Sequence, residues 1–408
     1  MSSPGETNAG SARPPAFGFI FISAVTCALS IGVMFPILPN LLKQFTGGDT
    51  ASAVEWNVIF ATSGGVMSFL AGPFLGLMAD RWGRRPVLLL CLSGLGIDFV
   101  FMAFAPSLGW LLVGRLISGA TSGVFSTANA YVADVTTPEN RARAFGWMGA
   151  AFNVGFLAGP AIGGLLGQMD LRLPFMAAAV LTLANAIYGF LILPESLPPD
   201  RRTSRFRLGR ANPIGSLRLL RSHPGLLGLA GIVFLSGLAQ MVWPSVFVLY
   251  TGYRYGWRPG VVGVTMMVGS LAGIAVQSFV VSPTIRRFGE RGATLAGATS
   301  MSVALFWQSL APTGLWYWRG MPLGFGGGLL NPGLQGLMTR RVLPDEQGQL
   351  QGVNQSLMGL ASAIGPSLFG ISFAWAIRHP EAHMSGLPLL LASVIMAICV
   401  GVGVRYAR

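Results

Sequence analysis

Long apolar stretches separated by short polar ones make up most of the chain. A membrane-spanning helix needs about 20 mostly apolar residues, and the pattern predicts about twelve such helices. The predicted segments are residues 17–42, 56–78, 87–105, 109–130, 144–167, 174–193, 226–251, 261–282, 293–310, 315–338, 350–376 and 387–404. Polar and apolar positions do not alternate within them, which favours helices over membrane strands. The sequence therefore predicts an all-α membrane protein.

The chain repeats itself at a constant offset of 206 residues. Chance matches would scatter over many offsets, whereas these share a single one. The matching pairs include Arg81/Arg287, Gly83/Gly289, Arg85/Arg291, Ala105/Ala311, Pro138/Pro344, Gly146/Gly352, Gly159/Gly365 and Pro160/Pro366. Two parallel halves of this kind are typical of transporters with a site between the halves. We expect a tail over residues 1–16, a six-helix bundle over 17–193, a linker over 194–224 and a second six-helix bundle over 225–408.

Basic residues are distributed unevenly over the polar connections. Cytoplasmic loops of membrane proteins carry an excess of Lys and Arg. If both termini are cytoplasmic, most of the 27 basic residues fall on that side. The arginine-rich stretch 194–224 then becomes a cytoplasmic linker, solvated or lying on the lipid surface, with a short amphipathic helix near Ile214–Leu220.

Composition supports a membrane protein. Hydrophobic residues make up 52% of the chain and charged residues 10%, whereas a soluble domain carries about 25% charged residues. The net charge of +13 is explained by arginines beside anionic lipid, so we expect the lipid bilayer and no nucleic acid as a partner. The 56 glycines and 26 prolines suit closely packed membrane helices.

Several other classes of protein and site are disfavoured. The N-terminus lacks the basic and apolar pattern of a signal peptide, so we expect the first apolar segment to be retained. Lys43 is the only lysine, so there is no P-loop for ATP. His379 and His383 flank Pro380, which breaks the helical spacing of a metal site. The three cysteines lie in apolar segments and predict no disulfide framework. We therefore expect no cofactor, no metal and no enzyme activity.

Asp98 is the one acidic residue well inside a predicted helix. A charged group in a bilayer is expensive, so such a residue is functional by default. A carboxylate that alternates between charged and neutral forms suits proton coupling. Arg115, one predicted helix later, is expected to bias the proton affinity of Asp98, bind an anion or hold helices together. The alternative is that Asp98 is a structural acid paired with Arg115 or a polar neighbour.

A patterned loop joins the second and third segments. We expect Gly83 at a position that has no room for a Cβ atom or that has a positive φ. Asp80 can cap the following helix and pair with nearby arginines, which could latch the helix ends in one state. The alternative is simple topological anchoring. The predicted gate motif comprises Gly76, Asp80, Arg81, Gly83, Arg84 and Arg85.

Small residues four apart mark the fifth segment. They predict a flat helix face that packs closely on a neighbour, with Pro160 bending the helix. Close packing without any bearing on transport direction is the simpler alternative. The motif comprises Gly155, Gly159, Pro160, Gly163 and Gly164.

Polar side chains within the predicted helices either line a cavity or bond between helices. Bonding between helices is the commoner role for each amide alone. The candidates for a substrate cavity are Gln240 and Trp243, expected on one helix face, Asn331 and Gln335, and, more weakly, Asn129 and Tyr131.

These motifs resemble the major facilitator superfamily. Residues 76–86 are similar to its loop between helices two and three, and residues 155–164 to the antiporter motif of its drug–proton exchangers. Residues 130–146, 193–196 and 345–352 look like those of the tetracycline–proton antiporter group. The resemblance covers nearly the whole chain. It implies twelve helices in two pseudo-symmetric halves, a functional monomer and a bacterial inner membrane.

The same resemblance implies that Asp98 and Arg115 are the family's acid in helix three and arginine in helix four. The chain departs from the group at two positions, because Cys27 and Met301 stand where the group has acids. The departure implies another proton stoichiometry, another coupling site or loss of coupling.

The function expected from these observations is secondary active transport. The main hypothesis is proton-coupled efflux of small amphipathic organic compounds, drug- or tetracycline-like, by alternating access. One alternative is a proton-independent facilitator or importer of a metabolite. The other is a non-transporting membrane sensor of the same fold.

Overall fold

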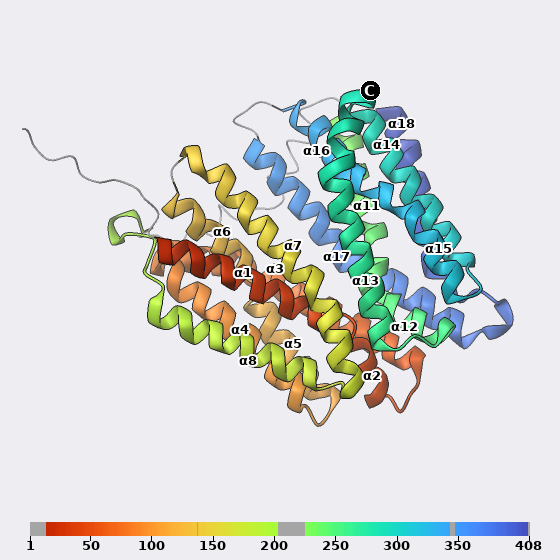
Figure 1. The fold of residues 1–408 in the computed structure, drawn as a ribbon, viewed down its shortest axis with the longest axis horizontal. Helices are drawn as coiled ribbons and strands as arrows, with labels where there is room; N and C mark the ends of the chain where they lie inside the picture. Colours follow the sequence, from red (N-terminus) through yellow and green to blue (C-terminus); the bar gives the residue numbers. More distant parts are fainter. Residues whose placement is uncertain (1–13, 137, 203–224, 343–346, 407–408) are drawn as a thin grey trace, which may run out of the picture. The chain divides into compact units, whose positions relative to one another are not determined.

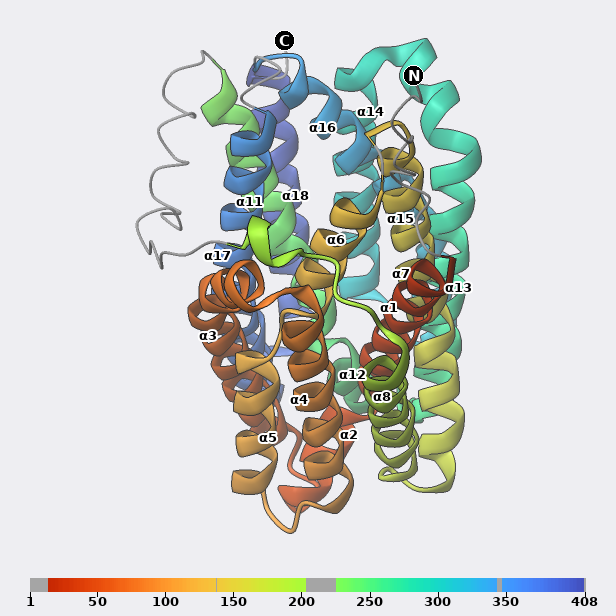
Figure 2. The same cartoon turned by 90° about the vertical axis from the view of Figure 1, so that its left-hand side faces the viewer.

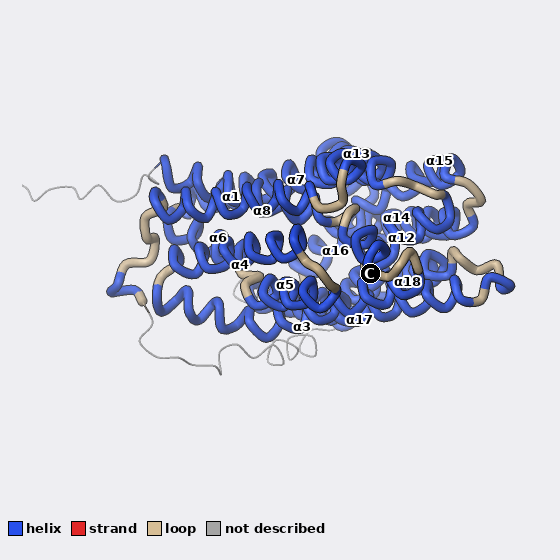
Figure 3. The backbone as a smooth tube through the Cα atoms, turned by 90° about the horizontal axis from the view of Figure 1, so that it is seen from below, coloured by secondary structure: helices blue, strands red, loops and turns tan. Residues whose placement is uncertain are grey.

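The computed structural model describes residues 14–136, 138–202, 225–342 and 347–406, and every regular element in these ranges is a helix (Figure 3). The first half of the sequence forms α1 (Pro14–Met34), α2 (Leu38–Phe45), α3 (Thr50–Trp82), α4 (Arg84–Phe104), α5 (Leu108–Ala120), α6 (Val124–Val135), α7 (Pro138–Met169), α8 (Leu173–Ile192) and the short η1 (Pro199–Arg201). The helix expected near Ile214–Leu220 and most of the 1–16 tail lie outside the described residues.

The second half forms a corresponding set of helices (Figure 1). These are α11 (Leu226–Gln240), α12 (Val242–Tyr255), α13 (Pro259–Ala275), η3 (Val276–Val280), α14 (Val281–Leu310), α15 (Gly314–Phe325), η4 (Gly326–Leu329), α16 (Leu330–Thr339), α17 (Gln347–Arg378), η6 (Pro380–Ala382) and α18 (Leu387–Tyr406). Within the described residues, 10 helical stretches are long and apolar enough to cross a membrane. Each of the twelve predicted segments corresponds to one helix or to a run of two or three consecutive helices, so the prediction of an all-α membrane fold is confirmed.

The first, fourth, seventh and tenth predicted segments are divided in two. Their breaks lie between α1 and α2, α5 and α6, α11 and α12, and α15 and α16. Three of the four breaks have a local chemical cause, which is Pro36 at the first, Gly123 at the second, and the glycine-rich η4 at the last. Proline removes a backbone donor, and glycine weakens a helix. The breaks recur at the same places in both halves, as the 206-residue repeat leads us to expect.

Helix packing repeats in the same way. In the first half α1 packs on α7 and α4 packs on α8, and in the second half α11 packs on α17 and α14 packs on α18. Figures 1 and 2 show α1 running beside α7. Because each helix of one pair lies about 206 residues from its counterpart, the sequence repeat is also a repeat of contacts.

The contacts divide the chain into two compact units. Unit 1 holds residues 1–35 and 66–207, and unit 2 holds residues 36–65 and 208–408. In unit 2 the Asn57 side chain donates to the carbonyl of Ser245 at 2.8 Å, and Arg378 pairs with Glu55 at 2.7 Å. By packing, α2 and the first part of α3 therefore belong with the second half of the sequence. The division of the chain into bundles 17–193 and 225–408 stays a prediction.

Candidate functional site

Asp98 and Arg115 meet inside unit 1. Asp98 lies on α4 and is completely buried, and Arg115 lies on α5 with 13% of its side chain exposed. Arg115 Nε donates to Asp98 Oδ1 at 3.2 Å, and a terminal nitrogen of the guanidinium contacts Asp98 Oδ2. Among the described residues, Asp98 is the one fully buried carboxylate. The two residues singled out by the sequence thus form one buried ion pair.

The surroundings of this pair are apolar and tightly packed. The guanidinium of Arg115 lies 3.1 Å from Met34 Sδ and near the sulfur of Met102. A Cβ atom on Gly114 would lie 2.8 Å from Asp98 Oδ1, so α5 approaches the carboxylate closely because residue 114 is glycine. Charges removed from water depend on each other for stabilisation. A change in the protonation of Asp98 would therefore be felt directly by Arg115.

The predicted gate motif contains a second cluster of charges, at one end of unit 1. Arg84, the first residue of α4, bonds Asp80 at 2.6 Å and Asp134 at 3.1 Å. Asp80, four residues earlier, lies in the last turn of α3, and Asp134 lies in the last turn of α6. One guanidinium thus joins the ends of α3, α4 and α6. The role of the motif as a latch stays a prediction.

Gly83 meets both expectations for a required glycine. Its φ is +107°, and a Cβ atom would lie 2.5 Å from Cδ of Glu195. The expectation that Asp80 caps the next helix is wrong. Glu195 occupies that place, because its Oε1 accepts from the backbone N–H of Arg84 at 2.8 Å.

The other members of the gate motif have separate surroundings. Arg85 donates to the carbonyl of Phe190 at 2.5 Å and stacks over its ring at 5.7 Å. Arg81 and Gly76 are exposed. The cluster of Asp80, Arg84 and Asp134 is therefore the chemically organised part of the motif.

The glycines of α7 form the contact with α1. A Cβ atom on Gly159 would lie 2.6 Å from the carbonyl oxygen of Leu29 and 2.7 Å from Cα of Gly32. Gly155 and Gly163, one turn to either side, meet α1 backbone in the same way. The expected flat face is confirmed. Pro160 lies inside α7 and, like Gly164, is buried.

The cavity candidates of unit 2 are scattered. Gln240 ends α11 and Trp243 lies in α12, so the break at Met241 separates them, and Trp243 packs edge-to-face on Phe247. The exposed side chains of α16 include Asn331 and Gln335. Their role in substrate binding stays a prediction.

The two candidates of unit 1 both lie on α6. Asn129 is exposed, whereas Tyr131 is buried and donates its hydroxyl to the carbonyl of Pro194 at 2.8 Å. That bond gives Tyr131 a structural role, and a place in a cavity stays a prediction for both residues.

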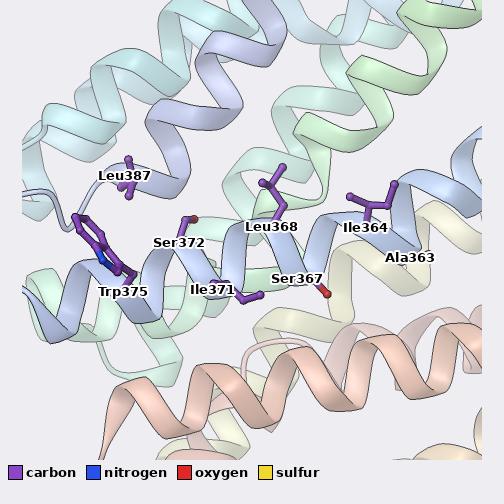
Figure 4. A pocket seen from close by; sticks show the side chains of 8 residues that line it. All are labelled: Ala363, Ile364, Ser367, Leu368, Ile371, Ser372, Trp375 and Leu387. Atoms are coloured by element: carbon purple, nitrogen blue, oxygen red, sulfur yellow. The ribbon is translucent and has the colours of Figure 1, made fainter.

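A groove of about 750 Å³ lies along α17 in unit 2 (Figure 4). Its wall carries no charged side chain, and the Ser372 hydroxyl in it donates to the carbonyl of Phe369. None of the predicted cavity residues lines it. The lining residues are Ala363, Ile364, Ser367, Leu368, Ile371, Ser372, Trp375 and, from α18, Leu387.

Comparisons with known proteins identify the family. The profile of the Major Facilitator Superfamily matches residues 20–366. The chain belongs to the major facilitator superfamily. The tetracycline resistance protein, class C, of Escherichia coli is 35% identical over 381 residues, which are 93% of this chain and 94% of that protein. The class B tetracycline resistance protein of Escherichia coli is 34% identical over 354 residues, 85% of each chain.

Solved structures agree on the fold of this superfamily member. A bacterial homologue of the human lysosomal transporter Spinster, in an inward-facing and unoccupied conformation, aligns with a TM-score of 0.77 at 15% identity, covering 99% of this chain and 98% of that one. The D-xylose–proton symporter aligns with a TM-score of 0.72 at 16% identity, covering 95% and 97%. The protein is a multi-pass integral membrane protein with the fold of secondary transporters.

Proposed function

We propose that this superfamily member is a proton-coupled exporter of small amphipathic organic compounds that works by alternating access between its halves. The buried pair of Asp98 and Arg115 carries the proposal. When Asp98 is ionised, the two charges neutralise each other. When Asp98 takes up a proton, Arg115 remains charged in an apolar environment, which is costly. The two protonation states therefore favour different conformations, and this difference couples proton movement to transport.

The sequence relatives suggest the class of substrate. Both relatives described above are named for tetracycline resistance, so tetracyclines are the first compounds to test. Cys27 is buried and Met301 is half-buried, and neither carries a charge where the tetracycline group has acids. We propose that Asp98 carries the proton alone, so that fewer protons move in each cycle than in that group.

Orientation and assembly belong to the same proposal. The Arg84 end of unit 1 faces the cytoplasm, as do both termini, because most of the basic residues then lie inside. The protein acts as a monomer in the inner membrane of a bacterium. Its partners are the substrate, protons and the surrounding lipid.

The decisive experiment uses purified protein in vesicles that contain a pH-sensitive dye. A panel of amphipathic drugs and metabolites, tetracycline included, is added to wild type and to Asp98→Asn. We expect substrate-dependent proton movement in wild type and its loss in the variant. The amide keeps the shape of the side chain but leaves Arg115 without its charged partner, so the melting temperature of the variant is measured beside its transport. The control is Glu381→Gln, which removes an exposed acid in η6.

Each of the other possible results would contradict this proposal and assign a different function. Full proton-driven transport by Asp98→Asn would contradict the role of Asp98. Substrate flux without a proton signal would identify a facilitator or importer and would mean that Cys27 and Met301 mark lost coupling. Binding without flux would identify a sensor.

A further inference from the structure

The helix α4 begins without a capping side chain of its own. The residue before it is Gly83, and the first N–H groups of a helix have no partner within the helix. The carboxylate of Glu195, from the chain that leaves α8, fills this place. Its Oε1 accepts from Arg84 N at 2.8 Å, and its Oε2 accepts from Arg85 N at 3.3 Å. A negative group at a helix N-terminus is stabilising.

The same carboxylate also folds its own segment. Glu195 Oε1 accepts from the backbone N–H of Ser196 at 3.0 Å and of Leu197 at 3.1 Å. A group held by backbone donors on both sides has little freedom. Because the Gly83 position leaves no room for a Cβ atom beside Glu195, the start of α4 and the end of α8 form one closely fitted junction.

This junction is joined to the charge cluster of the gate motif. The hydroxyl of Ser196 donates to Asp134 Oδ2 at 3.2 Å, and Arg84 Nε donates to the same oxygen at 3.1 Å. On the same helix as Asp134, Tyr131 bonds the carbonyl of Pro194. Residues 194–196 therefore fix the distance between the ends of α4 and α6 across which Arg84 and Asp134 meet.

Helix dipoles make this support necessary. Arg84 is a cation at the N-terminus of α4, and Asp134 is an anion at the C-terminus of α6. Both charges lie at the unfavourable end of their helix. The carboxylate of Glu195 supplies the negative charge that the start of α4 favours.

We propose that Glu195 is a positioning residue for transport, because it holds Arg84 where its side chain bridges Asp80 and Asp134. The proposal rests on the proposed function, since it assigns the residue a part in the transport cycle. Glu195 does not touch substrate. It acts through the ion pairs of Arg84, which close and open this end of unit 1 as a group.

The test is a double-mutant cycle on transport of tetracycline, or of the compound found in the panel, in the vesicles described above. Glu195→Ala should lower the maximal rate about ten-fold or more, with less effect on the substrate concentration at half-maximal rate. In an Asp134→Asn background the ion pair is already lost, so Glu195→Ala should change the rate by less than about two-fold. A purely structural role would lower the rate by the same factor in both backgrounds and would overturn the proposal.

Two further variants protect the test against misfolding. Glu195→Gln keeps one acceptor oxygen but loses the charge and the second oxygen, so it should fold and still lose most of the rate. Full activity in Glu195→Gln would contradict the proposal. The matched control is Asp200→Asn, an exposed acid in η1 of the same connection, which should transport as wild type does.

A readout without substrate separates this proposal from the proposed function. Amide hydrogen exchange of the purified full chain should become faster at residues 84–87 and at residues 131–135 in Glu195→Ala. If wild type transports nothing, the proposed function fails, and faster exchange at both helix ends would still support the link. Faster exchange at residues 84–87 alone would show a local cap that does not reach Asp134 and would overturn the proposal.

Discussion

Glu290 and Arg340 form an ion pair of 2.8 Å in unit 2 at the positions that correspond, after the 206-residue offset, to Arg84 and Asp134. Both halves thus have an ion pair at the same two positions, but the acidic and the basic residue are exchanged. Glu290 follows the break at Gly289 in α14, and Arg340 caps the C-terminus of α16. Both charges lie at the favourable end of their helix. The pair in unit 2 therefore needs no counterpart of Glu195.

The different exposure of the two arginines predicts unequal costs of breaking the two pairs, because Arg84 is 15% exposed and joins two carboxylates. Arg340→Ala removes a side chain that is 76% exposed, and exposed pairs contribute about 1 kcal/mol or less. Arg84→Ala leaves Asp80 and Asp134 facing each other without their shared partner, and bonds to charged groups contribute about 1.5–3 kcal/mol. We expect a clearly lower melting temperature for Arg84→Ala than for Arg340→Ala in the same detergent. Equal melting temperatures would show that the partly buried bonds of Arg84 stabilise the fold no more than the exposed pair of Arg340 does.

The contact of α7 with α1 gives a second prediction. Gly159→Ala places a Cβ atom against the backbone of Gly32 and Leu29, and rigid backbone cannot move aside cheaply. We expect a loss of about 1–3 kcal/mol, seen as a lower melting temperature or poor yield. The control is Gly149→Ala, on the same helix but with open space around the new Cβ atom. It should be neutral or stabilising, since alanine favours a helix over glycine.

The start of α3 predicts a pH effect. Asp49 caps this helix, accepting from the N–H groups of Ala51 and Ser52, both at 3.1 Å. The hydrogen bond from the Ser52 side chain, helped by these backbone bonds and by Arg378, holds the pKa of Asp49 below its ordinary value of 3.8. Because folding lowers this pKa, the ionised cap stabilises fully above about pH 4 and less as the pH falls through the lowered pKa.

The measurement is the melting temperature of wild type and of Asp49→Ala between pH 7 and pH 3. At pH 7 the variant should lose about 1 kcal/mol, and the difference should shrink at the acidic end. Asp49→Asn is the matched control, because asparagine caps a helix without titrating. A constant difference between wild type and Asp49→Ala over the whole range would contradict the role of the charge.

The all-α membrane fold and the place of Asp98 inside a helix could be predicted because their signals are local. Pairing of Asp98 with Arg115 was one of the alternatives that the sequence left open, and packing of α4 on α5 brings the two side chains together. A run of apolar residues marks each membrane-spanning helix. The tight turn at Gly83 and the close packing of the α7 glycines are each indicated by a short stretch of sequence. Glu195 could not be identified as the cap of α4, because it lies far along the chain from Gly83 and only packing brings them together. The hydrogen bond from Asn57 to the carbonyl of Ser245 could not be predicted for the same reason, because the two residues are far apart in the sequence. The charge exchange at Glu290 and Arg340 was readable from the offset alone and was missed.

A buried amide gives a fourth prediction. Asn354 on α17 is 5% exposed, and among the described residues neither its nitrogen nor its oxygen has a hydrogen-bond partner. Burying an unsatisfied polar group costs about 1–3 kcal/mol. We expect Asn354→Leu, of similar size and apolar, to raise the melting temperature of the purified protein. A lower melting temperature would indicate that ordered water satisfies the amide.

The buried pair of Asp98 and Arg115 gives the last prediction. Arg115→Met leaves the Asp98 carboxylate without its partner in an apolar site, and breaking a buried pair costs about 3–5 kcal/mol. In the double variant Asp98→Asn with Arg115→Met no buried charge remains. It should regain most of the lost stability, because an apolar replacement of a buried pair is often neutral. Proton-driven transport should be absent from both. Melting temperatures of the three proteins check this order, and a double variant no more stable than Arg115→Met would show that the pair does not set the stability of unit 1.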